Sequence, residues 1–480
     1  MIKTVPLCSA LSLVLAVLTM NTSSYGSDVV ARSNYMIVQE DHAVPPPPSE
    51  IEPSPSDLRP APEPEPVVPP APVLADEPWP EALSSASSTE SGADPAGWGA
   101  EPWTLPQPYW LQRRGISLGG WLQHGITFNA NNPPDGFNGP VAANDLDGEY
   151  QMNQLWLYLV RPVDTGGCGW DIGGRIDMMY GTDWRFGINK GLEDRINSFN
   201  RQTYGMVLPQ FYLEVGYNHL SVKLGHFAGI LDYEAIPAPL NPFYSHSYSY
   251  GYTVPQLVTG VLSDWRMTDQ LSLQAGVHRG WMQFESWNDD WDVMAGVRWE
   301  SCDGRTSLAY ALSSGRQSFQ PVLPFDNDNR FVYSLVAQRQ LTGRLRYVMV
   351  HNLGYEKNSI FREDAEWYGL NQYLLYQINP RWSANLRTEW LRDDDGVRIA
   401  GPGNIPGIRA WDGAGYAGNF YEVTAGVNWH PRSNITFRPE VRYDWYSGAA
   451  SRIENKPALP FDGGASSNQW LFGVDMIVTF

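Results

Sequence analysis

The chain has 480 residues, a formal net charge of −19 and a mean hydropathy of −0.35. This hydropathy excludes a bundle of transmembrane helices, and the acidic balance argues against a nucleic-acid partner, whose binding proteins are basic. The length allows two or three soluble domains or one large β architecture, and the 25 Tyr, 20 Trp, 17 Phe and 45 Gly favour the second.

Residues 1–26 have the composition of an export signal. Lys3 precedes the apolar run "LCSALSLVLAVLTM", and the small residues Ser24 and Gly26 follow it. The run is too short for a membrane anchor, so we expect a cleaved signal peptide and an exported, oxidising location. Cys168 and Cys302 then remain in the mature chain, at a spacing that matches no metal site.

Residues 27–109 form an acidic segment rich in proline. Residues 1–109 hold 3 basic and 14 acidic side chains, and 19 of the 38 prolines lie between Pro45 and Pro108. Such a sequence cannot form a helix or a sheet and is expected to be extended and disordered. It is either a plain linker or a periplasmic extension that reaches the cell wall.

From residue 110 to 480 the sequence changes to aromatic strands of ten to fourteen residues, the length that crosses a bilayer at a tilt. We predict about sixteen of them, which makes this part of the chain all-β. Their approximate spans are 116–129, 150–162, 169–182, 206–217, 219–231, 257–266, 270–284, 290–301, 305–314, 330–341, 344–355, 366–378, 381–393, 420–430, 434–445 and 468–480.

The connections alternate in length along the chain. Those after even-numbered strands are short, such as "NH", "TD", "TG" and "NP", whereas those after odd-numbered strands are mostly long. This alternation predicts a closed antiparallel transmembrane β-barrel in the outer membrane, with both barrel ends at the short-turn rim, facing the periplasm. The strand 468–480 should therefore pair with the strand 116–129 and leave no open edge.

Large aromatic residues recur every eight positions on one face of four strands. Trp291 and Trp299 illustrate the spacing, as do Trp382 and Trp390. Eight strand residues span about 26 Å, or roughly 20 Å along the membrane normal at a 40° tilt, close to the distance between two aromatic girdles. A soluble β-sandwich would also alternate but has no reason for large aromatic residues at this spacing. A soluble β-rich enzyme or propeller is the alternative to a membrane barrel. Pro439 interrupts one of these strands and should lie at a bulge.

The opposite face of these strands carries mixed charges and should point into a water-filled lumen. Rings of such charges set the ion preference of a pore, although any one of them could serve only as a solvated, paired wall residue. The predicted pore-lining residues are Arg175, Asp177, Arg298, Glu300, Arg387, Glu389, Arg438, Glu440, Arg442 and Asp444.

Two segments, "IGGRIDMMYGTDWRF" and "VKLGHFAGILDYEAIPAPLNPFYSHSYSYGYTVPQLVTGV", resemble the β-barrel porin-2 family, the OmpL-like group of outer-membrane barrels. The similarity runs from about Gly119 to Phe480, with His226 where a basic residue is expected. It implies passive diffusion of small hydrophilic solutes or ions, without catalytic residues, metal or cofactor. The residues that carry it most specifically are Arg175, Asp177, Tyr180, Gly181, Asp183, Gly225, Glu234, Asn241, Tyr244, Ser245, Pro255, Thr259 and Gly260.

Residues 232–256 form the third long loop, which in porin-like barrels folds inward and narrows the pore. We therefore expect a constriction at Asp232, Glu234, Asn241, Tyr244, His246 and Tyr248. Within it "YSHSYSYGY" places aromatic rings at every second position. This pattern fits a track on which sugars stack, and it fits equally a hairpin standing above the rim.

The remaining features are less specific. The acidic stretches "DNDN" and "DDD", at 326–329 and 393–395, could bind Ca²⁺, yet acid is ordinary in external loops. Cys168 and Cys302 fall in different turns, so a disulfide between them is not expected. We interpret the chain as an outer-membrane channel; a plugged barrel that anchors the membrane to the cell wall and an outer-membrane hydrolase are the alternatives. Membrane lipids, the barrel assembly machinery and peptidoglycan are the expected partners, and the oligomeric state stays open.

Overall fold

The computed structural model describes residues 105–197, 203–286, 289–316, 329–357, 364–399, 415–453 and 456–480. All of them belong to one compact unit, Pro64–Phe480. The expected signal peptide, most of the proline-rich segment and residues 326–328 of "DNDN" lie outside the described residues.

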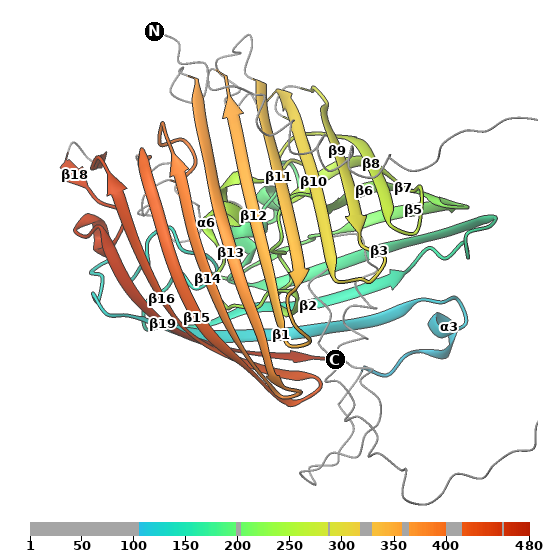
Figure 1. The fold of residues 1–480 in the computed structure, drawn as a ribbon, viewed down its shortest axis with the longest axis horizontal. Helices are drawn as coiled ribbons and strands as arrows, with labels where there is room; N and C mark the ends of the chain where they lie inside the picture. Colours follow the sequence, from blue (N-terminus) through green and yellow to red (C-terminus); the bar gives the residue numbers. More distant parts are fainter. Residues whose placement is uncertain are drawn as a thin grey trace, which may run out of the picture. The chain divides into compact units, whose positions relative to one another are not determined.

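Antiparallel strands form the wall of the molecule (Figure 1). β4 and β5 both pair with β3, so the seventeen-stranded sheet has sixteen wall positions. The strands are β1 (Ser117–Asn129), β2 (Tyr150–Arg161), β3 (Trp170–Gly181), β4 (Gly205–Val207), β5 (Phe211–Tyr217), β6 (Leu220–Ala228), β7 (Leu257–Arg266), β8 (Leu271–His278), β9 (Asp292–Glu300), β10 (Thr306–Arg316), β11 (Asn329–Gln340), β12 (Leu345–Glu356), β13 (Ala365–Asn379), β14 (Trp382–Asp393), β15 (Gly418–Arg432), β16 (Ile435–Gly448) and β19 (Asn468–Thr479).

Pairing between β1 and β19 closes the sheet into a barrel. The register runs from Trp121 opposite Thr479 to Asn129 opposite Leu471. Gly120 and Phe480 extend it by exchanging two backbone hydrogen bonds of 2.9 Å. The predicted pairing of the first and last strands is confirmed, and so are the short connections, for example the two residues between β5 and β6.

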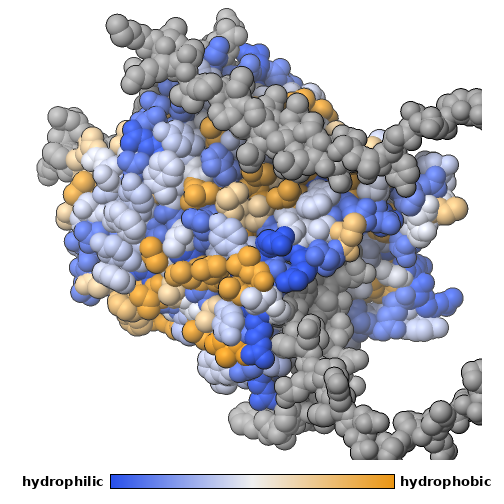
Figure 2. Space-filling view, in the orientation of Figure 1, coloured by the Kyte–Doolittle hydropathy of each residue, from blue (hydrophilic) through white to orange (hydrophobic). Residues whose placement is uncertain are grey.

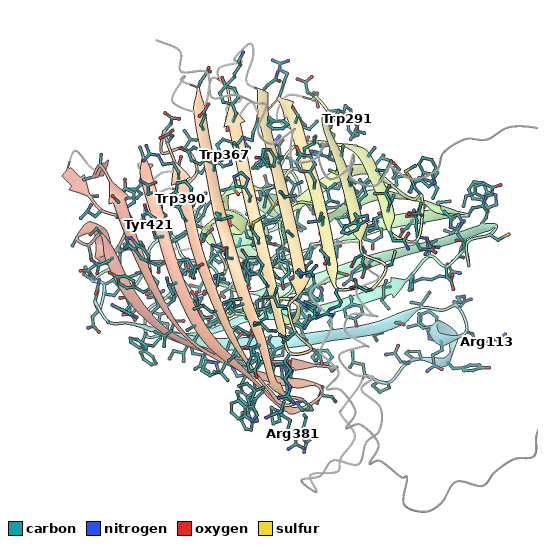
Figure 3. The ribbon with its side chains drawn as sticks, viewed as in Figure 1. Arg113, Trp291, Trp367, Arg381, Trp390 and Tyr421 are labelled. Atoms are coloured by element: carbon teal, nitrogen blue, oxygen red, sulfur yellow. The ribbon has the colours of Figure 1, made fainter. Side chains whose placement is uncertain are left out.

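The outer surface carries the apolar parity that the sequence predicts. Trp291, Trp299, Trp382 and Trp390 are 37–54% exposed. In Figure 2 the most apolar residues form a band over the lower part of the visible wall, and residues of intermediate hydropathy cover much of the rest. Figure 3 shows Trp291, Trp390 and Tyr421 toward the long-loop rim, with Arg381 at the opposite, short-turn rim. Aromatic rings of neighbouring strands stack on this surface: the ring centroids of Tyr421 and Trp445 lie 4.9 Å apart, with an angle of 8° between the ring planes.

Two local expectations are wrong. The strand predicted to reach residue 284 ends at His278, because Gly280 and Met282 adopt the positive φ angles of 110° and 53°. Pro439 causes no register shift, since its pairing opposite Val474 of β19 continues the neighbouring pairs. The hydrogen-bond ladder between β16 and β15 is interrupted at Pro439 instead. Because proline has no backbone N–H, pairing is lost on this side of β16 only.

The helices are short; the first of them precedes β1, and the others lie in connections between strands. They are α3 (Tyr109–Gln112), α4 (Trp184–Gly187), α5 (Glu193–Asn197), η1 (Ala238–Leu240), α6 (Tyr248–Thr253) and η2 (Asp462–Gly464), and one long loop adds the hairpin β17 (Ser451–Ile453) and β18 (Lys456–Ala458). No helix in the described part of the chain has the length and hydropathy of a membrane span.

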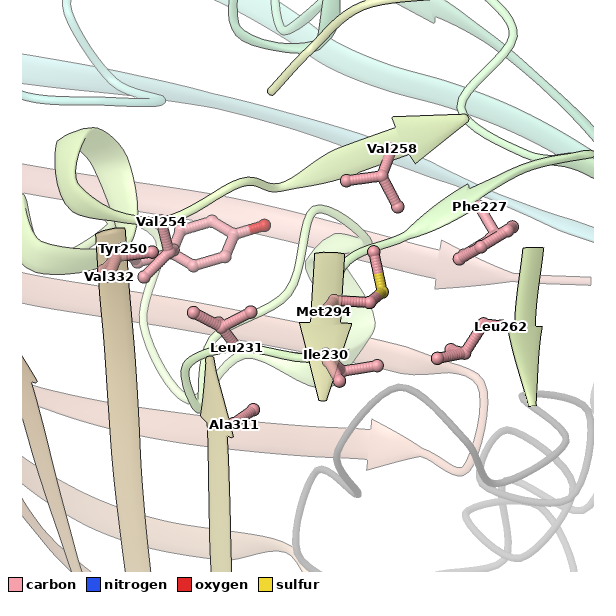
Figure 4. Close-up of a cluster of buried hydrophobic side chains, with 10 residues drawn as sticks. All are labelled: Phe227, Ile230, Leu231, Tyr250, Val254, Val258, Leu262, Met294, Ala311 and Val332. Atoms are coloured by element: carbon pink, nitrogen blue, oxygen red, sulfur yellow. The ribbon is translucent and has the colours of Figure 1, made fainter. Parts of the chain in front are cut away.

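The connection between β6 and β7, residues 229–256, folds into the barrel and is called the inner loop below. It contains η1 and α6, and Figure 1 shows α6 behind the wall formed by β12, β13 and β14, which it contacts. On the other side, Ile230, Leu231 and Tyr250 pack with Met294 of β9 and Val332 of β11 (Figure 4). The barrel interior therefore has an apolar core against one part of the wall.

Candidate functional site

The inner loop spans the barrel interior and bonds to strands on several sides of it. Gln154 of β2 donates to the carbonyl of Ile236 at 2.8 Å. Asn352 of β12 donates to the carboxylate of Asp232 at 2.6 Å, and the Tyr373 hydroxyl of β13 donates to Glu234 at 2.7 Å. These strands are far apart in the wall order, so the loop crosses the lumen.

Two buried wall carboxylates hold the backbone of the inner loop. Glu440 of β16 accepts hydrogen bonds from the N–H groups of Tyr244 and Ser245 at 2.9 and 3.1 Å. Glu389 of β14 accepts those of Tyr248 and Ser249 at 2.7 and 2.6 Å. Each carboxylate thus receives two adjacent peptide donors, and Glu389 does so at the start of α6. We call Glu389 and Glu440 the loop clamps.

Three wall arginines hold the carbonyl groups of the same loop. Arg387 of β14 donates to the carbonyl of Ser245 at 2.7 Å and to Glu234 at 2.9 Å. Arg438 donates to the carbonyls of Ala238 and Asn241 at 3.0 and 2.7 Å. Arg442 donates to that of His246 at 2.7 Å. The alternating wall charges therefore match the alternating donors and acceptors of a peptide backbone.

The ten predicted pore-lining residues occupy two different environments. Arg298 is half-buried beside a cavity and Glu300 is exposed at the short-turn rim. The other eight are at most 5% exposed, so they contact protein where the sequence suggested open water. These buried residues are Arg175, Asp177, Arg387, Glu389, Arg438, Glu440, Arg442 and Asp444.

The six predicted constriction residues all lie in the inner loop. The loop's side chains bond within it and to the wall: Asn241 donates to the carbonyl of Ala235 at 2.6 Å, and His246 Nδ1 lies 2.8 Å from Glu234. Tyr244 donates to Asn153 of β2 at 2.9 Å and Tyr248 to Asp444 of β16 at 2.7 Å. The six predicted constriction residues are Asp232, Glu234, Asn241, Tyr244, His246 and Tyr248.

Neither expected role of the tyrosine pattern is found. Residues 248–253 form the helix α6, whose cap is the Ser247 hydroxyl accepting from the N–H of Tyr250. Tyr244, Tyr248 and Tyr250 are at most 5% exposed, so their faces offer no stacking track for sugars. The spacing of two therefore describes no strand, and the segment lies inside the barrel instead of above the rim.

The inner loop carries two carboxyl groups with opposite shifts in pKa. Burial raises the pKa of Asp232 to about 6, and the charge of Glu234 adds to this rise. The hydrogen bond from Asn352 acts in the opposite direction and lowers the pKa. Burial also opposes ionisation of Glu234, but the charge of Arg387 and the hydrogen bond from His246 hold its pKa at about 2. Glu234 is thus ionised at neutral pH, and the charge of Arg387 stabilises this ionised form.

Replacing Asp232→Asn should change how stability depends on pH. A carboxyl whose folded-state pKa is raised from 3.8 to about 6 destabilises the fold increasingly as pH rises between these values. Relative to wild type, the variant should gain up to about 3 kcal/mol between pH 4 and 6. The Asn352 amide can rotate to match it, since its Oδ1 has no hydrogen-bond partner among the described residues. Thermal unfolding in detergent measures this difference, and parallel curves for both proteins would contradict it.

A cavity of about 530 Å³ lies inside the barrel near the short-turn rim. Strands β2, β3 and β5 to β9 provide its walls, together with the β2–β3 and β5–β6 turns. Arg298 bonds Asp264 there, and the Lys223 ammonium lies 5.3 Å from the centre of the Tyr212 ring. The charged lining residues are Arg161, Arg175, Lys223, Arg266, Arg298, Asp164, Glu214 and Asp264.

Several residues that hold the inner loop were missed by the sequence analysis. Asn153 and Gln154 of β2, Asn352 of β12 and Tyr373 of β13 all bond to it, and Glu422 of β15 pairs with Arg387. All five are buried, and each lies on an inward-facing position of its strand. Inward parity was the available signal for Asn352, Tyr373 and Glu422, whereas the adjacent Asn153 and Gln154 are both buried because the β1–β2 register shifts beside them.

The other features of the sequence form no site in the described residues. Cys168 and Cys302 are free and exposed, in the β2–β3 and β9–β10 turns. The "DDD" carboxylates already have partners: Asp393 accepts from the N–H of Val397, Asp394 from Arg392 and Asp395 from the N–H of Glu366. No group of three or more metal-ligating side chains occurs in the described ranges.

Comparisons with known proteins agree on the architecture. Residues 115–480 match the family model described as "Putative beta-barrel porin-2, OmpL-like", and no curated protein matches the chain. An anion-selective porin from Comamonas acidovorans has 11% identity and a TM-score of 0.51, covering 76% of this chain and 99% of its own. Pseudomonas putida OprB has 13% identity and a TM-score of 0.47, covering 77% of this chain and 95% of its own. At 11% identity, the likeness to the Comamonas acidovorans porin speaks for the fold alone.

Proposed function

Because the chain belongs to the family described as putative beta-barrel porin-2, OmpL-like, we propose that it conducts small hydrophilic solutes or ions by passive diffusion through the outer membrane. The observation that carries the proposal is a closed sixteen-stranded barrel whose lumen is narrowed by the inner loop, held on charged wall residues. The cavity at the short-turn rim forms one vestibule of this path. The proposal includes no catalytic step.

The recorded current of the purified protein in a planar lipid bilayer tests this function. Stable, stepwise openings support a channel. A protein that is folded, shown by its heat-modifiable migration in a gel, but gives no steps would contradict it. Exchanging the salt on one side of the bilayer then reports the ion preference of the charged lumen.

The second candidate is a plugged barrel with a structural role. It is favoured by the burial of eight predicted pore-lining residues beneath the inner loop and the neighbouring wall. In this case the proline-rich segment would bind peptidoglycan and tie the membrane to the cell wall. A silent bilayer, together with co-sedimentation of the full chain with peptidoglycan, would favour this candidate over the channel.

We propose further that the short-turn rim, with both barrel ends, faces the periplasm. Cys168 and Cys302 provide a test because both are exposed in short turns. A polyethylene-glycol maleimide too large for the channel should leave intact cells unlabelled and should label both thiols once the outer membrane is permeabilised. Ala450→Cys, at an exposed position of a long loop, should be labelled on intact cells in a variant carrying Cys168→Ser and Cys302→Ser. Labelling of the native thiols on intact cells would reverse the orientation.

A further inference from the structure

A group of buried arginine and tryptophan side chains lies at the long-loop end of the interior. Trp367 lies near the N-terminal end of β13 and is fully buried, near the upper ends of the strands in Figure 3. The guanidinium of Arg398, from the β14–β15 loop, lies 4.8 Å from the centre of the Trp367 ring and 5.7 Å from that of Trp281. Arg330 of β11 lies on the same Trp281 ring at 4.6 Å.

Backbone hydrogen bonds and a glycine position the side chains of this group. The Asp393 carboxylate accepts the N–H groups of Val397, Arg398 and Ile399 at 3.1, 2.8 and 2.8 Å, which turns the loop inward. Gly354 of β12 leaves room for the indole, because a Cβ there would lie 2.1 Å from a Trp367 ring atom. Arg398 is thereby fixed against Trp367 by contacts from two strands.

The group contains more hydrogen-bond donors than acceptors. Arg330 donates to Glu356 at 2.8 Å, whereas the nearest Arg398 nitrogen lies 4.0 Å from that carboxylate. Within the described ranges, Arg398 Nε, Arg398 Nη1 and Trp367 Nε1 are buried and have no hydrogen-bond partner. A buried donor without a partner costs about 1–3 kcal/mol, and more when it is charged. Burial and the charge of Arg330 also lower the pKa of Arg398, to about 10.

We propose that Arg398 and Trp367 form a binding site for a small inorganic anion of the halide class. The groups without partners are all donors, which excludes a metal cation as the ligand. A halide accepts from several donors at once, and the donors without partners lie beside the Trp281 and Trp367 rings. Neither nearby carboxylate accepts a hydrogen bond from the Arg398 guanidinium among the described contacts: Glu356 lies 4.0 Å away, and Asp393 accepts from backbone N–H groups. The site is independent of whether the barrel conducts.

Crystals of the full chain soaked in bromide test the site directly. Anomalous difference density should appear within hydrogen-bond reach of Arg398 and Trp367 Nε1. It should disappear in Arg398→Gln and persist in Arg392→Gln, which removes a partly exposed arginine paired with Asp394. Density of water alone at this position, or a bromide peak that survives in Arg398→Gln, would overturn the proposal.

Thermal unfolding in detergent provides a second measurement, at constant ionic strength while bromide replaces gluconate. Wild type and Arg392→Gln should gain in Tm as bromide increases, since a ligand of the folded state stabilises it. Trp367→Phe keeps the ring but removes its N–H, so the gain should become smaller. Arg398→Gln should lose the gain; an equal gain in all four proteins would reject the site.

Discussion

Replacing both loop clamps, Glu389→Gln with Glu440→Gln, is expected to give frequent openings to a larger conductance. Each carboxylate accepts two backbone N–H groups of the inner loop. A glutamine at the same position retains one acceptor oxygen but loses the second oxygen and the charge. Hydrogen bonds to a charged group contribute about 1.5–3 kcal/mol, so losing about 3 kcal/mol in total raises the ratio of undocked to docked loop about a hundredfold. Single-channel recording in planar bilayers measures the change.

The matched control for the loop clamps is Glu300→Gln. This carboxylate is exposed at the short-turn rim and appears in no hydrogen bond with the inner loop among the described residues. Its records should keep the conductance levels of the wild type. If the double variant is folded and heat-modifiable but its levels and dwell times equal those of the wild type, the clamps do not hold the constriction.

Arg387→Met is expected to lower the free energy of unfolding by about 3–5 kcal/mol, because it leaves Glu234 without its arginine and Glu422 with only Arg442, 3.8 Å away. Arg387 is fully buried and pairs with Glu234 of the inner loop and Glu422 of β15. Methionine fills similar volume, so the loss reports the charge more than the packing. Thermal unfolding in detergent, followed by heat-modifiable migration, measures it.

Two further variants separate the buried pairing from a general effect of removing arginine. Arg392→Met removes a partly exposed pair with Asp394 and should cost at most about 1 kcal/mol. Adding Glu422→Gln to Arg387→Met should restore part of the lost stability, because it removes a buried carboxylate that would keep only Arg442, 3.8 Å away, as its cation. Equal stability of wild type and Arg387→Met would show that the buried charges do not depend on this arginine.

The wall of the barrel could be predicted from the sequence because one face of each strand must meet lipid. An apolar residue at every second position, with tryptophans eight apart, allows only one register, and a slip of one residue would turn charges such as Asp292 and Arg298 outward. The strand bounds and the β1–β19 pairing followed from this constraint. β8 was one exception, since the aromatic residues beyond His278 continue its composition but not its extended backbone. The strand predicted over 206–217 was another, because it is divided into β4 and β5.

The inner loop could be located but its fold could not be predicted. Its position after β6 followed from chain order and from the family resemblance, yet its contacts join residues up to two hundred positions apart, as between Arg438 and Ala238. Glu389 and Glu440 bind backbone N–H groups, which every residue possesses, so no side-chain pattern in the loop reveals the partner. The tyrosine spacing was misleading for a similar reason, because capping by Ser247 favours a helix locally.

The seam between β1 and β19 sets the order of events during assembly. Residues at this seam are separated by about 350 positions along the chain, the Gln123 to Asp475 hydrogen bond among them. Pairings of such separation form late and slowly, since a very long stretch of chain must be ordered first. Until then the growing sheet presents two open edges, each able to capture a strand of another chain. Insertion into the membrane must therefore keep these edges apart from other proteins until the seam forms.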